Sequence, residues 1–130
     1  MLNSKDVNAL GNILNSTWGE GSSRHDRNDT GATITGNMQG DVLNVRFMTV
    51  VHFASERSLQ DQMRNLTRES YDRLNKYIDN VKAQFREQTG KSLKLKELSN
   101  KDNLELIQAT SNSPRKIAYY RRFADLQVDV

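Results

Sequence analysis

The sequence predicts an α+β domain in which two antiparallel β-hairpins flank one long α-helix packed on their sheet, with a short N-terminal helix before them. Three patterns predict this fold. Apolar residues recur every three or four positions through residues 58–87, which is the helical period. They alternate with polar residues through 41–53, and two further apolar runs, at 104–110 and 116–128, are separated by a segment with the single proline. We expect residues 32–130 to form one domain.

Residues 1–31 predict a short N-terminal helix followed by a flexible polar arm. Ser4 is the expected helix cap. The apolar positions that follow at helical spacing are Val7, Leu10, Leu14 and Trp18. Residues 19–31 contain no large apolar side chain, so burial cannot offset the entropy lost on ordering them. We expect this arm to become ordered on a neighbouring subunit, with Trp18 as its anchor; the alternative is that the helix docks on the protein's own core.

The first hairpin is expected to join strands at residues 33–38 and 41–53. A two-residue turn at Gln39-Gly40 would place Ile34 opposite Val45, so that the apolar faces of the two strands agree. The apolar residues on this face of the second strand are Leu43, Val45, Phe47, Val51 and Phe53.

The long helix is expected to span Ser58 to Glu87, with Ser58 and Asp61 as a capping box and Ser55 as a rival start. Gly90 is well placed to end it, because glycine readily adopts the left-handed conformation that closes many helices. The stripe expected to pack on the sheet consists of Leu59, Met63, Leu66, Ser70, Leu74, Tyr77, Val81 and Phe85.

After the helix, residues 91–96 are expected to form a short strand. A separate strand at 104–110 then turns through 111–115 into a final strand that begins at Lys116. Two sets of apolar residues lie on opposite faces of that final strand: Ile117, Tyr119 and Phe123 on one, Leu126 and Val128 on the other. We therefore expect a bulge near Ala124.

The residue types argue against an enzyme, and no catalytic residue, cofactor or small-molecule substrate is expected. The chain has no cysteine, which excludes disulfides, thiolate nucleophiles and Cys-ligated zinc. His25 falls in the polar arm, and His52 is expected to be a sheet residue on the less apolar face. Neither belongs to a Ser-His-Asp order or a helical His pair. No membrane span or signal peptide is expected either.

One segment partly matches a calcium-binding loop, but we expect no metal site there. Four positions match the ligand spacing that opens a calcium loop: Asp26, Asn28, Thr30 and Gly31. Because the twelfth position is Asn37 rather than a bidentate glutamate, we expect a solvated loop.

The net charge of +3 arises in the last third of the chain. Its basic residues are Lys91, Lys94, Lys96, Lys101, Arg115, Lys116, Arg121 and Arg122. This predicts a weaker field than a dedicated nucleic-acid-binding surface carries. A nucleic-acid-binding accessory module that uses this basic third is therefore the alternative function.

The cluster Tyr119-Tyr120-Arg121-Arg122 has three readings: ordinary sheet surface, a protein interface, or a surface that stacks single-stranded nucleic acid. Adjacent residues of a strand point to opposite faces, so the four form two pairs rather than one stacking platform. We favour the protein interface. The interface candidates are Trp18, Tyr119, Tyr120, Arg121 and Arg122.

Two of the expected elements exceed the size of a compact domain. A sphere of this many residues has a diameter of about 36 Å. The long helix would span about 45 Å, and the strand at 41–53 roughly 40 Å. Elements this long leave apolar faces that need neighbours, so we expect a homo-oligomer or assembly with other structural subunits.

Three features resemble small structural proteins of tailed bacteriophages: the hairpin ending Val51-His52-Phe53, the long helix from near Ser58, and residues 113–122. Neck or head–tail connector, tail-terminator and capsid-associated proteins are of this type. The resemblance covers residues 32–130 loosely. It implies a structural role without catalysis in a virion assembled in the host cytoplasm.

Overall fold

The computed structural model describes residues 2–21, 32–107 and 116–130, with backbone alone from residue 16 to residue 21. Within these ranges the elements are α1 (Ser4–Gly21), β1 (Thr33–Gln39), β2 (Val42–Phe53), α2 (Glu56–Thr89), β3 (Lys94–Ile107) and β4 (Lys116–Asp129). The strands form one antiparallel sheet in the order β1-β2-β4-β3. The expected α+β fold, with two hairpins and one long helix, is confirmed.

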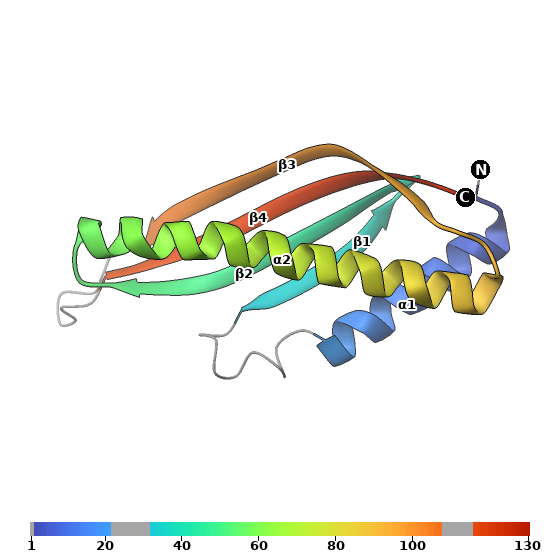
Figure 1. Ribbon diagram of the computed structural model, residues 1–130, viewed down its shortest axis with the longest axis horizontal. Helices are drawn as coiled ribbons and strands as arrows, with labels where there is room; N and C mark the ends of the chain where they lie inside the picture. Colours follow the sequence, from blue (N-terminus) through green and yellow to red (C-terminus); the bar gives the residue numbers. More distant parts are fainter. Residues whose placement is uncertain (1, 22–31, 108–115) are drawn as a thin grey trace.

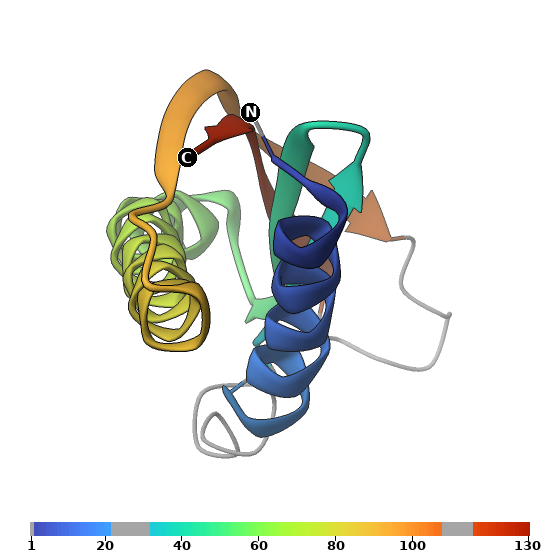
Figure 2. The same ribbon diagram turned by 90° about the vertical axis from the view of Figure 1, so that its right-hand side faces the viewer.

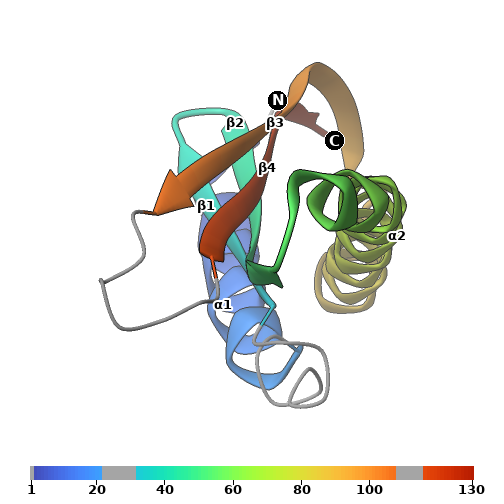
Figure 3. The same ribbon diagram turned by 90° about the vertical axis from the view of Figure 1, so that its left-hand side faces the viewer.

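The molecule has two layers and is elongated (Figure 1). Helix α2 runs along the sheet for its full length, and its 34 residues span about 51 Å. Both helices lie on one face of the sheet (Figures 2 and 3). Gly36 of β1 marks the place where they meet, because it lies against Leu14 of α1 and Tyr77 of α2. The other face of the sheet carries neither helix.

The core lies between the helices and the covered face of the sheet. Strands β2 and β4 alternate cleanly between inward and outward residues. The inward positions of β4 are Ala118, Tyr120, Arg122, Ala124, Leu126 and Val128, all of them buried. They meet the helix residues Leu10, Ile13, Leu14, Leu59, Leu74, Tyr77, Val81 and Phe85.

Helix α2 begins at Glu56, and its cap lies three residues before the expected Ser58. Ser55 is the N-cap: its side chain accepts a hydrogen bond from the Ser58 backbone, and the Ser58 side chain accepts one from the Ser55 backbone. The rival start was thus correct, and Ser58 occupies the third helical position. Gly90 ends the helix in the left-handed conformation, with φ of 73°. Met63 and Leu66 of the expected stripe are only half-buried, and its other members are buried.

The register of the first hairpin differs from the predicted one by two residues. The turn lies at Gly40-Asp41, so Ile34 pairs with Phe47 rather than with Val45. The preferred two-residue hairpin turns need a positive φ at their first position. Gly40, with φ of 60°, occupies that position. A shift by two residues keeps the same side chains on each face, which is why the apolar faces still agree.

The second half of the sheet corrects two further predictions. The two expected strands, at 91–96 and 104–110, are not separate over the described residues, because β3 is continuous from Lys94 to Ile107. Residues 108–110 lie outside the described ranges. As an edge strand with few buried residues it lacks the apolar alternation that would identify it in the sequence. The irregularity lies in β3, between Glu97 and Ser99, and not near Ala124 of β4. The expected turn at 111–115 lies outside the described residues.

Helix α1 begins with a different cap from the expected Ser4. Asn3 accepts a hydrogen bond from the Asp6 backbone (2.8 Å), and Asp6 accepts one from the Asn3 backbone (3.3 Å). Leu10, Ile13 and Leu14 are buried in the same core as the sheet, whereas Val7 is 43% exposed. The first helix thus contributes to the domain that the sequence assigned to residues 32–130. The flexibility of the polar arm stays a prediction, since residues 22–31 lie outside the described ranges.

Candidate functional site

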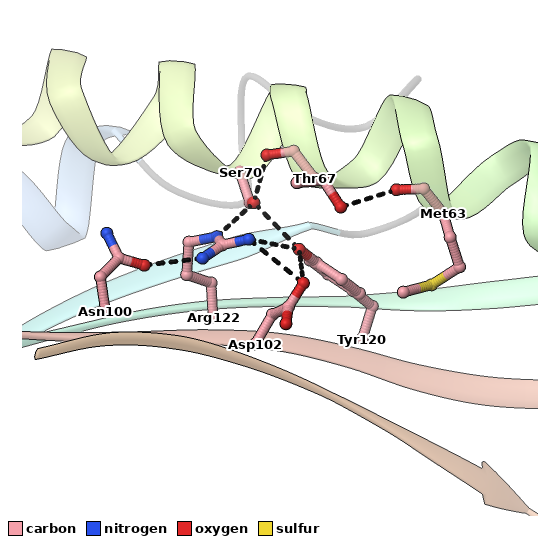
Figure 4. A network of polar contacts seen from close by, with 7 residues as sticks. All are labelled: Met63, Thr67, Ser70, Asn100, Asp102, Tyr120 and Arg122. Atoms are coloured by element: carbon pink, nitrogen blue, oxygen red, sulfur yellow. Dashed lines mark hydrogen bonds and ion pairs between the residues drawn. The ribbon is translucent and has the colours of Figure 1, made fainter.

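A buried arginine lies on the covered face of the sheet (Figure 4). Arg122 of β4 is 3% exposed. Its Nε donates a hydrogen bond to Ser70 of α2 (2.8 Å), and Nη1 donates to Asn100 of β3 (2.6 Å). Nη2 donates both to Asp102 of β3 (3.2 Å) and to the Tyr120 hydroxyl (3.1 Å). A buried guanidinium would be costly without such partners, and here each nitrogen has one.

The partners of Arg122 are also bonded to one another. The Ser70 hydroxyl donates to the Thr67 carbonyl (2.9 Å), and the Tyr120 hydroxyl donates to Asp102 (3.2 Å). On the side of the helix, the Tyr71 ring covers the guanidinium at 3.9 Å. The network therefore joins α2, β3 and β4 at one point.

These contacts give the network a structural role rather than a role in proton transfer or ligand binding. Arginine stays protonated in proteins, so Arg122 cannot exchange a proton with a substrate. Its burial also leaves little of it for a ligand to reach. The arrangement ties the middle of α2 to the sheet in one register, because only one placement of Ser70 meets Arg122 Nε.

Sequence reasoning missed this network, although a signal was present. Ser70 is a polar residue inside the apolar stripe of the long helix, and Arg122 is a charged residue at an inward position of the last strand. Two polar residues on two facing apolar stripes predict a buried pair. Because a bulge is expected near Ala124, the sequence pattern does not show that Arg122 lies on the same face as the buried Leu126 and Val128.

Another polar group on the covered face, the Tyr77 hydroxyl, is buried and has no hydrogen-bond partner among the described residues. Burial raises the pKa of Tyr77 to about 12. The hydroxyl lies against Gly36, where an added Cβ would approach it within 2.4 Å. Only glycine therefore fits opposite this tyrosine.

An ion pair ties the start of α1 to the end of α2. Asp6 is buried, and Lys91 Nζ donates to both of its carboxylate oxygens, at 2.9 and 3.1 Å. The hydrogen bond from Lys91 is the largest influence and lowers the pKa of Asp6 below its usual value of 3.8, against the opposing effect of burial. Lys91 itself is 44% exposed.

The uncovered face of the sheet, here called the open face, has a mixed apolar and polar surface. Its outward residues on the two central strands include Met48, Val50, Ile117, Tyr119 and Phe123, all half-buried. Two arginines stack on its aromatic rings: Arg46 over Phe123 at 5.5 Å and Arg121 over Tyr119 at 5.1 Å. Arg121 also forms an ion pair with Glu105 (2.7 Å). The open face therefore has an apolar centre on β2 and β4.

The five interface candidates separate into three places. Tyr119 and Arg121 lie on the open face, as half-buried neighbours. Tyr120 and Arg122 lie on the covered face, where they belong to the core network. The expected division into two pairs on opposite faces is confirmed. The Trp18 side chain lies outside the described residues.

Several basic residues of the last third have local acidic partners. Lys91 pairs with Asp6, and the two arginines of β4 pair with Glu105 and Asp102. His52 is an exposed residue at the end of β2, on the open face, as expected. His25 and the positions weighed as a calcium loop, from Asp26 to Gly31, lie outside the described residues.

Two hollows lie near these surfaces. One of about 370 Å³ lies on the open face, against Arg46, Met48, Arg121 and Phe123. Another, of about 430 Å³, lies at the end of the molecule where α2 begins and is lined by Phe53, Leu59, Leu106 and Ile107. In the described part of the chain no three His, Asp or Glu residues gather as a metal site. Among the described helices, none is both long and apolar enough to cross a membrane.

Comparison with known proteins gives no relative: no family model, curated protein or solved structure matches this chain.

Proposed function

We propose that this protein is a non-enzymatic structural subunit of a multimeric assembly, with a bacteriophage virion as its expected location. The observation that carries the proposal is the open face of the sheet. Both helices cover the opposite face, so Met48, Val50, Ile117, Tyr119 and Phe123 have no covering layer among the described elements. A sheet with apolar side chains on both faces needs a layer on each.

The residue types at this face support a protein partner. Tyr, Phe, Met and Arg are the types enriched at protein interfaces, and those with large buried contacts dominate binding energy. The length of α2 and the strands supports the same role, because a long body offers a large area for contact.

Nucleic-acid binding through the basic last third is the competing function. The stacking of Arg46 on Phe123 and of Arg121 on Tyr119 weighs against it. Aromatic faces that stack bases need to be free, and both rings already carry a guanidinium.

Light scattering of the purified chain over a range of concentrations tests the proposal. We expect the mass to rise with concentration and to change little with salt. A labelled single-stranded oligonucleotide added to the same samples tests the competing function. Binding that weakens on the order of tenfold or more between 50 and 200 mM salt, by a chain that stays monomeric, would favour nucleic acid and refute the proposal.

The virion location has its own test. Mass spectrometry of purified particles of a phage that encodes this chain should detect it as a component. If the chain is abundant in infected cells and absent from the particles, the location is wrong while the role as a structural subunit stands.

A further inference from the structure

We infer that the open face binds a second copy of this chain, so that two sheets pack face to face across a two-fold axis parallel to β2 and β4. This inference rests on the proposed structural role and names its partner. It follows from the area of the face, its arrangement of apolar and polar residues, and the absence of directly opposed like charges.

The open face is large enough for a stable dimer. Strands of about 12 residues at about 3.3 Å each, four abreast at about 4.8 Å, cover roughly 600–700 Å² per copy once the shorter β1 is allowed for. Two copies would bury roughly 1,300 Å², within the range of about 1,200–2,000 Å² for specific interfaces.

The open face also has the anatomy of an interface. Its apolar residues lie on the two central strands, where Val50 and Tyr119 are direct cross-strand neighbours. The edge strands contribute polar residues at the rim: Thr33 and Thr35 on β1, Lys101 and Asn103 on β3. An apolar centre with a polar rim is what protein interfaces present.

The sheet order makes this face complementary to itself. A two-fold axis that runs between β2 and β4, parallel to them, exchanges β2 with β4 and β1 with β3 while keeping each residue at its own height. The strand register gives the height of each residue. The axis therefore places Arg46 over Phe123 of the second copy, Arg121 over Met48, Tyr119 over Val50, Asn44 over Asp125, and Thr35 over Lys101.

No like charges oppose one another in this arrangement, and each charged residue named above meets a neutral one. An axis across the strands at the middle of β2 would instead bring Arg121 against Arg121 of the second copy. Aligned sheets cross at about 30°, so the opposition is closest near the middle of β2 and β4, around Met48 and Val50. Like charges in contact across an interface are unfavourable, which favours the axis along the strands.

The first test compares two identical substitutions. Val50→Lys places a charge on the open face next to Tyr119, whereas Val7→Lys makes the same change at an exposed site on α1. We expect Val50→Lys to raise the dimer dissociation constant about tenfold or more. Val7→Lys should leave it unchanged. Circular dichroism and thermal melting confirm that both variants are folded.

The second test uses the absence of cysteine from the chain. Asn44→Cys and His52→Cys place single thiols at opposite ends of β2, about 26 Å apart along the strand. With the axis along the strands, each thiol lies near the equivalent thiol of the second copy, because packed sheets are about 10 Å apart. A thiol crosslinker of about that length should therefore link both variants into dimers. An axis across the strands would leave both unlinked.

The outcomes separate the two proposals. A wild-type chain that forms oligomers, with Val50→Lys and the single-cysteine variants behaving as if the face were free, overturns this inference and leaves the structural role intact. A chain that is monomeric at every concentration overturns both. If the face binds an oligonucleotide instead, Val50→Lys should strengthen that binding by adding a positive charge, which would also overturn the inference.

Discussion

Strand β4 carries the same two residue types on each of its faces, with opposite results. Tyr120 and Arg122 point inward, are buried, and join a network with Ser70 of α2. Tyr119 and Arg121 point outward and are half-buried, with a guanidinium over a ring and an ion pair at the rim. Residue type did not decide which pair belongs to the core. The alternation of side chains along the strand decided it, because it determined which pair faces the helices.

The two pairs should contribute very differently to the free energy of unfolding, because their surroundings differ. On the covered face a lost partner leaves buried polar groups unsatisfied. On the open face of the separate subunit, water replaces whatever is removed, so an exposed ion pair contributes little to folding. The following predictions test this contrast, from the largest expected effect to the smallest.

Removing the buried arginine should have the largest effect. Arg122→Ala removes the donor to Ser70 and to Asn100 and one of the two donors to Asp102, and it opens a cavity beneath Tyr71. We expect the unsatisfied buried groups and the cavity together to lower the free energy of unfolding by about 3–5 kcal/mol, measured by denaturant titration. A loss of less than about 1 kcal/mol would mean that the network does not hold α2 on the sheet.

Enlarging Gly36 should be the next most costly change. Gly36→Ala drives a Cβ into the Tyr77 hydroxyl, and overpacking of this kind costs about 1–3 kcal/mol. Tyr77→Phe alone should be neutral or stabilising, because the hydroxyl has no described partner. The double variant should recover part of the loss. Denaturant titration of all four chains gives the coupling, and strict additivity would contradict the contact.

The ion pair of Asp6 should make stability depend on acid pH. Its pKa in the folded protein lies below the usual 3.8, so its contribution is complete above that pH and is lost as the pH falls through the folded value. Asp6→Asn should remove this loss. The control Asp61→Asn, on the exposed side of α2, should not. Unfolding free energies at about pH 7 and about pH 3 test this; equal acid sensitivity of Asp6→Asn and wild type would contradict it.

Removing the outward arginine should have the smallest effect on folding. Arg121→Ala breaks an ion pair with Glu105, which is 58% exposed, so we expect a change below about 1 kcal/mol. In the same chain the dimer dissociation constant should rise, because Arg121 lies at the proposed interface. A loss of stability equal to that of Arg122→Ala would remove the contrast between the two faces.

The helix prediction succeeded because its signals are local. The stripe from Leu59 to Phe85 has the helical period, and Ser55 and Gly90 act on the backbone next to them. The start was misplaced only because both Ser55 and Ser58 can cap. The hairpin at Gly40 failed in register for a related reason: the apolar pattern permits shifts by two residues, and the turn conformation selects one.

Strand β3 shows where local signals end. Its residues from Glu97 to Asn103 have no apolar alternation, and they form a strand because β4 pairs with them along its length. Alternation along the last strand correctly divides its four candidate residues into two pairs on opposite faces, whereas the sequence leaves the role of each pair open.

The sequence by itself determined the α+β class, the long helix with its stripe and its terminating glycine, and the alternation that separates Tyr119 and Arg121 from Tyr120 and Arg122. These depend on spacing and on the backbone preferences of single residues. Only the tertiary structure decided that both helices cover the same face, and hence which pair is buried and which face is left open. That choice depends on packing between elements distant in the chain: Ser70 meets Arg122 across 52 positions, and Gly36 accommodates Tyr77. No local pattern records such contacts.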